Sequence, residues 1–405
     1  MNILESLQWR YATKKFDSDY TLNPEQLTIL KESFNLTATS YGLQPIKLIV
    51  IQSKELRERL LPHAFEQRQI LDSSHLFVIC IQKESSVRDI ENYFKLVKDG
   101  SVVKSIIPHQ RPSGITGFVM NTRLPKFADW RVREALITAF NFEFINQSNT
   151  GGRQNRIQSY FSNSVLSKKT GPAEGMVRDF LQPHAASLLP GTLDSYTLPV
   201  SDGTVRNRKN IRIADDLLNK AGWTVIDGLR KNQAGKPFQI VTLLKQGDTE
   251  SQSMMAVYQQ ALERLGIKLT TEVLDSAQYK ERTQIYDFDM AYYRRGLSLS
   301  PGNEQMLYWG SEGINKPGTR NWMGMNSPAA EDMIARLVSS KSHNQFLAAA
   351  QALDRILTAG RYVIPIHTNT VSRLAHVKEI KFSDRLPMYG DWIGFLPDVW
   401  WHEPD

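Results

Sequence analysis

Hydrophobic and polar positions in the first hundred residues follow two patterns, one typical of helices and one typical of buried strands. Apolar residues spaced three and four apart predict a helix that opens at Pro24 behind the N-cap residue Asn23, and a short charged helix over residues 54–61. Continuous apolar runs predict strands over residues 47–51 and 75–81. The order of these elements predicts an α+β arrangement with helices over a sheet.

From residue 115 onward, apolar runs and helical stripes alternate along the chain. Strands are expected over residues 115–121, 238–244, 267–273, 288–293 and 362–367, and helices over residues 129–140, 209–221, 254–265, 329–337 and 345–358. Gly222 and Gly266 directly follow two of these helices, as C-cap glycines do. This alternation predicts an α/β lobe with a mixed sheet.

Length and composition indicate a globular protein with more than one domain. The chain has 405 residues, of which 41% are hydrophobic and 22% charged, an ordinary mix for folded domains. Residues 1–6 lack the basic and apolar segments of a secretory signal, and no run of about 18 apolar residues follows, so we expect a cytoplasmic protein without a membrane segment. The single cysteine, Cys80, excludes a disulfide within the chain and lies in an apolar run expected to be core.

The formal net charge is +7, and the positive charges are spread along the chain. The densest cluster is Arg206, Arg208, Lys209 and Arg212. It is interpreted as the solvated start of a helix rather than as a nucleic-acid patch.

Residues 9–17 carry the most specific polar pattern of the first segment. Ile3, Leu4 and Leu7 have helical spacing, and the cations of residues 9–17 follow this predicted helix with small residues between them. This arrangement suits a phosphate or an anionic ring. The guanidinium of Arg10 can bind phosphate through two donors, and Lys14 adds a point charge. The alternative interpretation is a solvated helix end.

Together with residues 40–45 and 71–75, this segment resembles the N-terminal half of the FMN-dependent nitroreductase family. The resemblance implies an FMN-dependent NAD(P)H oxidoreductase that binds its flavin between two subunits of a homodimer. The positions it assigns to FMN are Arg10, Ala12, Lys14, Ser40, Gln67 and Gln69. Ala12 replaces a Ser that is frequent in the family, and the resemblance ends near Lys95, so at most half of a flavin site is expected.

The rest of the chain resembles the C-terminal part of the family 5 extracellular solute-binding proteins. The resemblance is carried by residues 121–135, 214–223 and 286–290, and within that family residues 106–114, 292–304 and 320–324 look like the branch that imports oligopeptides and the peptide-nucleotide microcin C. It implies a type II periplasmic-binding-protein fold, a peptide-like ligand held between two lobes, and an ABC-transporter permease as partner. The solute-binding relatives are periplasmic.

Ligand contacts are expected between Tyr292 and Trp322. An Arg-Arg pair can bind a carboxylate or phosphate, but neighbouring strand residues face opposite sides, so at most one is expected to face the ligand. Each Trp in this region either lines a side-chain pocket for the ligand or belongs to the hydrophobic core. The predicted peptide-binding residues are Arg294, Arg295, Ser298, Asn303, Trp309 and Trp322. Relatives that grip a peptide amino terminus have an Asp near Ser298, which this chain lacks, so recognition of a free amine is not expected.

Motifs for other chemistry do not appear in the sequence. Paired cysteines, a His-Glu-x-x-His pattern, a P-loop and a Gly-x-Ser-x-Gly elbow are all missing, so we expect no metal site and assign no catalytic residue.

The two resemblances meet near residue 98 without a linker. We therefore expect a nitroreductase-like fragment over residues 1–98 and the C-terminal lobe of a solute-binding protein over residues 101–405, with residues 380–405 returning toward the first lobe that such proteins build from the front half of their chain. Peptide binding is the favoured function, compromised because both sites are incomplete. The alternatives are a flavin reductase with a replaced C-terminal half, and a rearranged or merged reading frame without selected function.

Overall fold

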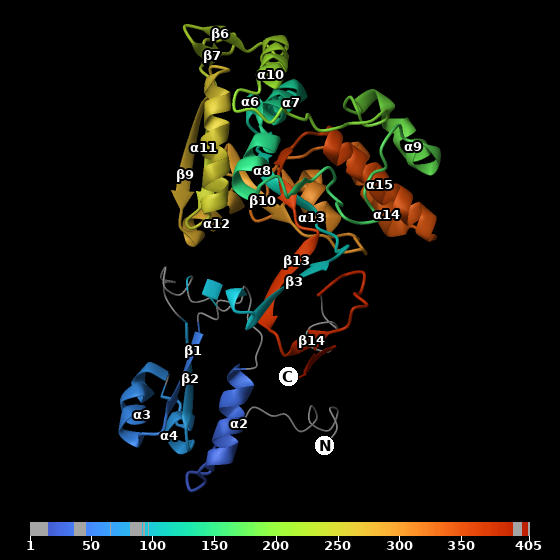
Figure 1. Cartoon of the computed structure of the whole chain (residues 1–405). Coiled ribbons are helices and arrows are strands. Elements are labelled where there is room, and N and C mark those ends of the chain that lie inside the picture. The colour runs from blue at the N-terminus through green and yellow to red at the C-terminus, as the bar shows by residue number, and fades with distance from the viewer. Residues whose placement is uncertain are drawn as a thin grey trace. The chain divides into compact units, whose positions relative to one another are not determined.

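The computed structural model describes residues 15–35, 46–64, 66–81, 91, 94, 95, 97–391 and 399–403. The chain divides into two compact units, one made of Met1–Pro108 and Val371–Asp405 and the other of His109–Thr370 (Figure 1). The C-terminal residues join the first unit because strand β13 (Val371–Val377) pairs antiparallel with β3 (Val102–Pro108). The boundary between units therefore differs from the division near residue 98 that the two resemblances indicate.

Unit 2 is built on a five-stranded mixed sheet, as the sequence predicts. The strand order is β11 (Val363–Pro365), β4 (Ile115–Met120), β10 (Met290–Arg295), β8 (Gln239–Lys245) and β9 (Lys268–Leu274). Strand β4 is antiparallel to both of its neighbours, whereas β8, β9 and β10 are parallel to one another. The carboxyl ends of these three strands therefore lie at one edge of the sheet.

Helices cover both faces of this sheet, which confirms the predicted α/β class. Helices α14 (Pro328–Ser339) and α15 (His343–Ala359) pack on the face that carries Val119 and Ala291. The other face, which carries Phe118 and Met290, is covered by α7 (Trp130–Ala139), α10 (Arg208–Lys220) and α11 (Thr249–Glu263). Each fully buried aliphatic or aromatic side chain contributes about 1.5–3 kcal/mol, so these two cores hold unit 2 together.

Side-chain caps fix where the helices of unit 2 begin. Asp129 caps α7 by accepting from the Arg131 amide at 2.8 Å, as predicted. Helix α11 begins at Thr249, five residues before the predicted start, because Asp248 caps it through the Ser251 amide at 3.0 Å. The strand expected over residues 362–367 is divided between β11 and β12 (His367–Thr368).

Two neighbouring buried charges on α15 anchor the irregular chain that follows β5 (Asn155–Arg156). The Asp354 carboxylate accepts from Ser159 Oγ at 2.7 Å and from the amides of Tyr160 and Lys168 at 2.8 and 2.7 Å. Arg355 donates to backbone carbonyls, among them Gly171 O at 2.6 Å. Long-range polar contacts thus replace regular secondary structure in this part of unit 2. The shorter elements of the unit are α6 (Pro125–Ala128), α8 (Phe142–Thr150), α9 (Gly175–Leu181), η2 (Gln182–Ser187), β6 (Thr224–Ile226), β7 (Leu229–Lys231), α12 (Ser276–Gln284), α13 (Gln305–Trp309) and η3 (Ser311–Gly313).

From residue 24 onward, unit 1 contains the helix, strand, helix and strand in the predicted order but little enclosed core, and the helix predicted before them lies outside the described residues. Its elements are α2 (Pro24–Asn35), β1 (Ile46–Ile51), α3 (Lys54–Leu60), η1 (Leu61–Ala64), α4 (Gln69–Asp72), β2 (Leu76–Ile81), β3, β13, β14 (Ile380–Phe382) and β15 (Trp400–His402). Strands β1 and β2 form an antiparallel pair. Among the described residues of this unit, Ile107 is the one fully buried hydrophobic side chain, so the expectation that Cys80 is core was wrong: it is only partly buried. In the described ranges, no helix is long and apolar enough to cross a bilayer.

Candidate ligand-binding site

The carboxyl ends of the parallel strands β8, β9 and β10 mark the candidate site in unit 2. In open α/β sheets, ligands bind outside this edge, where loops leave the strands. Strand β10 ends here with Arg294 and Arg295, and an irregular loop leads from it to α13. The exposure of the two arginines alternates as strand geometry predicts, because Arg294 is exposed and Arg295 is buried.

Arg295 is the most constrained charged group of this edge. Its guanidinium carbon lies 3.4 Å from the ring centroid of Tyr308 and 4.8 Å from that of Trp309, and the residue is 8% exposed. Its Nε and the hydroxyl of Tyr293, on the same face of β10, are both buried and have no hydrogen-bond partner among the described residues. Burial lowers the pKa of Arg295, because it disfavours the charged form.

Further charges surround the Tyr308 ring and the loop beside it. Arg320 donates a hydrogen bond to the Tyr308 hydroxyl, and its guanidinium carbon lies 5.2 Å from the ring centroid. Glu304 is the nearby carboxylate: burial raises its pKa, but hydrogen bonds from the Gly302 amide and the Gln305 side chain outweigh this and lower the pKa overall. The edge therefore combines three arginines with one ionised, locally satisfied carboxylate.

The loop after β3 lies against the end of β10. A Cβ atom on Gly114 would lie 2.0 Å from Arg295 O, and Gly114 has a φ of +65°. Within the same loop, Arg111 O accepts from Asn163 Nδ2 at 2.7 Å. Two segments that carry the oligopeptide-importer resemblance, residues 106–114 and 292–304, thus meet at Arg295.

Replacing Gly114 by Ala is expected to destabilise unit 2. The side chain would meet backbone that cannot move aside, and the left-handed conformation adds about 1–2 kcal/mol. Gly171→Ala is the matched control, because its φ is +91° and a Cβ there meets nothing within 4 Å. Urea unfolding should show a clearly larger loss for Gly114→Ala, and equal losses would contradict the close approach.

The other predicted ligand residues divide between surface and core. Ser298 and Asn303 are exposed in the loop after β10, and Ser298 Oγ accepts from the Ser300 amide at 3.0 Å. Trp309 is fully buried, and its Nε1–H donates to Gln305 Oε1 at 3.1 Å, so it lies beneath Arg295 rather than on the surface. Trp322 is partly buried, with the rings of Tyr279, Phe288 and Tyr293 at 6.5, 5.9 and 5.6 Å.

Sequence reasoning missed Arg123, which organises the chain around Trp322. Its guanidinium donates to the carbonyls of Gly313, Ile314, Asn321 and Trp322 and to Asn121 Oδ1. It also lies 3.7 Å from the ring centroid of Tyr286, and burial lowers its pKa to about 10. The only signal in the sequence is its position directly after Asn121 and Thr122 of the solute-binding motif.

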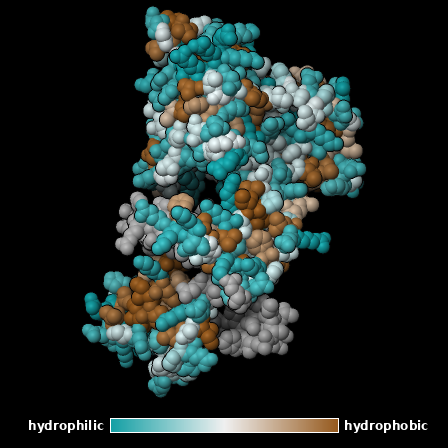
Figure 2. Space-filling model, viewed as in Figure 1, coloured by the Kyte–Doolittle hydropathy of each residue, from teal (hydrophilic) through white to brown (hydrophobic). Residues whose placement is uncertain are grey.

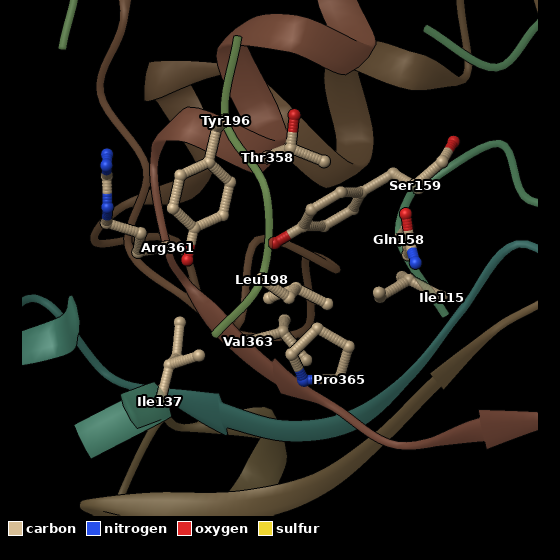
Figure 3. Close-up of a pocket in the computed structure, with 11 residues that line it drawn as sticks. Ile115, Ile137, Gln158, Ser159, Tyr196, Leu198, Thr358, Arg361, Val363 and Pro365 are labelled. Carbon is tan, nitrogen blue, oxygen red and sulfur yellow. The ribbon is translucent and has the colours of Figure 1, made fainter. Parts of the chain in front are cut away.

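A small cavity elsewhere in unit 2 does not suit an organic ligand. It has a volume of about 20 Å³, which is room for about one water molecule. Figure 3 shows its wall, where the Tyr196 ring lies opposite Ser159 and Gln158, above Val363 and Pro365. The hydroxyls of Tyr160 and Tyr196 are buried there without a partner among the described residues. A bound water would satisfy them.

Most of the predicted flavin contacts lie outside the described residues: Arg10, Ala12, Lys14 and Ser40. Gln67 is exposed, and Gln69 opens α4. Among the described side chains, no group of three or more His, Cys, Asp or Glu is placed to hold a metal ion.

Two family models match the chain. The model of the bacterial extracellular solute-binding proteins, family 5 (middle region), matches residues 84–317. The model of the nitroreductase family matches residues 7–124, so the two matches overlap.

Curated relatives match about three quarters of the chain. A putative binding protein of Brucella melitensis is 35% identical over 310 residues, which cover 76% of this chain and 50% of that protein. The peptidoglycan-binding protein YepA of Agrobacterium fabrum is 34% identical, with 76% and 49% covered. The probable peptide-binding protein YejA of the same organism is 33% identical, with 79% and 52% covered. The chain spans about half the length of the curated relatives it matches.

Solved structures share the fold at low sequence identity. The oligopeptide-binding protein AppA of Bacillus subtilis, in complex with a nonapeptide, is similar with a TM-score of 0.57 and 16% identity, covering 87% of this chain and 59% of that one. A periplasmic oligopeptide-binding protein of Thermotoga maritima gives a TM-score of 0.54 and 15% identity, covering 78% and 58%. Both likenesses support the type II binding-protein fold predicted from the sequence. With the family 5 model matching more than half of its residues, the chain belongs to the bacterial extracellular solute-binding proteins of family 5.

Proposed function

We propose that this chain binds peptide-like solutes that carry an anionic group, at the carboxyl edge of the sheet in unit 2, as a component of ABC import. The observation that carries the proposal is the buried Arg295, stacked on Tyr308 with an unpartnered Nε.

A buried cation without an anionic partner is costly, and a carboxylate offers the planar pair of acceptors that a guanidinium binds best. The Tyr293 hydroxyl, on the same face of the strand, is likewise buried without a hydrogen-bond partner among the described residues. The exposed Ser298 and Asn303 offer short polar contacts to a peptide backbone. Arg294, also exposed, adds positive potential that attracts an anionic solute to this edge.

The names of the relatives support a peptide-like ligand. One relative is named a probable peptide-binding protein, another a peptidoglycan-binding protein, and the AppA structure holds a nonapeptide. Peptides and peptidoglycan fragments share amide backbones and carboxylates, and both groups suit the polar loop after β10. Family 5 binding proteins work with ABC transporters, so we propose a permease of that class as partner.

Calorimetry with matched oligopeptides tests this proposal. We expect the purified chain to bind peptides with a free carboxyl terminus, with or without an acetylated amino terminus, and to bind the C-terminal amides at least about tenfold more weakly, since a hydrogen bond to a charged group contributes about 1.5–3 kcal/mol. Equal affinity for acids and amides would refute the role of the anion. The absence of heat with every peptide would refute peptide binding.

A second candidate function, flavin binding by the first part of the chain, is favoured by the nitroreductase match over residues 7–124. In this proposal Arg10 and Lys14 hold the FMN phosphate, and Ser40 reaches the flavin of the partner subunit in a homodimer. Bound FMN would supply hydride transfer from NAD(P)H. Flavin absorbance that stays with the protein after dialysis would support this candidate, and a colourless protein that takes up no added FMN would exclude it.

A further inference from the structure

The edge of unit 2 opposite the candidate site carries an arginine cluster that the proposed function does not use. Arg206, Arg208, Arg212 and Arg264, with Ile211, line one open hollow of about 610 Å³. Arg264 follows α11 and precedes β9, so the hollow lies toward the amino ends of the parallel strands. No salt bridge joins these four arginines to a carboxylate of the described residues.

The fold itself brings these charges together. Arg264 Nη1 donates to the carbonyls of Val205 and Arg206 at 2.9 and 3.0 Å, which ties the loop before α10 to the end of α11. The carboxylate next in the chain, Glu263, accepts from Gln259 on the adjacent helical turn. Guanidinium groups that line one hollow carry the same charge and repel one another, and an anion in the hollow would relieve that repulsion.

An exposed apolar hairpin lies beside the arginine hollow. Strands β6 and β7 pair across a turn in which Asp227 and Gly228 both have positive φ. The aliphatic side chains at its tip, Val225, Ile226 and Leu229, are 49%, 46% and 47% exposed. Asp227, the acid of the turn, is paired with Lys231 at 3.6 Å.

Hydrogen bonds attach this hairpin directly to the residues after Arg264. The Arg230 amide donates to Gly266 O at 2.8 Å, and the fully buried Arg230 side chain donates to Leu265 O at 2.9 Å. Figure 1 shows β6, β7 and α10 at the same end of unit 2, and Figure 2 shows hydrophobic side chains beside hydrophilic ones there. Clustered cations and half-exposed aliphatic side chains thus share one end of the unit.

We propose that this end of unit 2 is a peripheral binding surface for an anionic lipid bilayer. The arginines bind headgroup phosphates, for which the guanidinium group is well suited. The hairpin tip places its aliphatic side chains at the boundary between headgroups and acyl chains. A soluble polyanion would use the arginines but would leave the aliphatic side chains exposed, so the combination favours a membrane surface.

Co-sedimentation of the full chain with vesicles tests this proposal. We expect the protein to pellet with phosphatidylglycerol-containing vesicles at low salt, to remain in solution with pure phosphatidylcholine, and to be released as salt is raised. Arg206→Gln combined with Arg212→Gln should weaken binding about 25-fold, because each cation near an anionic surface contributes about fivefold. Ile226→Ser combined with Leu229→Ser should weaken it as well, with the salt dependence kept.

The matched control removes two exposed charges far from the hollow, with Arg178→Gln and Lys280→Gln, and should bind vesicles like the unchanged protein. Equal loss in the control and the arginine variant would overturn the proposal, as would failure to pellet with anionic vesicles. Tight binding of tripolyphosphate, together with vesicle binding that the hairpin variant leaves unchanged, would assign the arginines to a soluble anion and would also overturn it.

Discussion

Replacing Asp354 by Ala is expected to lower the free energy of unfolding of unit 2 by about 3–5 kcal/mol. This carboxylate is fully buried and accepts three hydrogen bonds from a segment almost 200 residues earlier in the chain. Alanine would leave the amides of Tyr160 and Lys168 without acceptors inside the protein. Each unsatisfied buried donor costs about 1–3 kcal/mol, and the cavity left by the carboxylate adds to that cost.

Urea unfolding followed by tryptophan fluorescence measures this effect. Asp332→Ala is the control, because Asp332 also lies on a helix of the same layer and pairs with His184 and Arg336, but it is partly exposed. Such a pair contributes up to about 1 kcal/mol. Asp354→Asn keeps one acceptor oxygen, so its loss of unfolding free energy should lie between those of Asp354→Ala and Asp332→Ala. A loss for Asp354→Ala no larger than that for Asp332→Ala would show that the segment is held by other contacts.

The elements of unit 2 were predictable because each has a local cause. In α14 and in α15, the N-cap residue and the apolar stripe lie within the same short stretch of sequence. The alternating exposure of Arg294 and Arg295 follows from strand geometry alone. The predicted start of α11, residue 254, lies five residues after the observed start at Thr249, because the first turn of the helix is polar and shows no apolar stripe. Only the cap at Asp248 marks it.

The long-range contacts of the molecule could not be predicted from local patterns. Pairing of β3 with β13 joins residues more than 260 positions apart, and Ser105 even hydrogen-bonds His376 across it. Nothing in the sequence near residue 371 indicates that this segment pairs with β3. The sequence prediction therefore placed the C-terminal residues in the same part as residues 101–370, whereas they belong to unit 1. The same holds for Arg123, whose five acceptors come mostly from residues 313–322.

The burial of aromatic residues in the candidate site also could not be predicted from local sequence patterns. From the sequence, Trp309 and Trp322 could each line a pocket or belong to the core, yet Trp309 is fully enclosed and Trp322 only partly. The difference arises from Tyr160 and Gln305, which close over Trp309 from another segment and from its own helix. The stacking of Arg295 on Tyr308, on which the proposed site rests, likewise depends on a turn of chain that the spacing of residues does not reveal.

Arg295→Gln is expected to lower the affinity for a peptide with a free carboxyl terminus by about 10- to 100-fold. The variant removes the charge from a buried site where a hydrogen bond to a charged group contributes about 1.5–3 kcal/mol. The corresponding peptide amide should lose less than about threefold, because it brings no anion to the site. Arg294→Gln, on the exposed face of the same strand, should cost only about two- to fivefold for either peptide.

Arg295→Lys serves as the second variant, since it keeps the charge but loses the planar group that stacks on Tyr308. We expect it to recover only part of the selectivity for acid over amide. Calorimetry with both peptides gives the acid-to-amide ratio for each variant, and the unfolding midpoint shows whether the variant is folded. If Arg295→Gln is folded and weakens acid and amide equally, Arg295 supports the loop without contacting the ligand, and the anion-binding role must pass to Arg294 or Arg320.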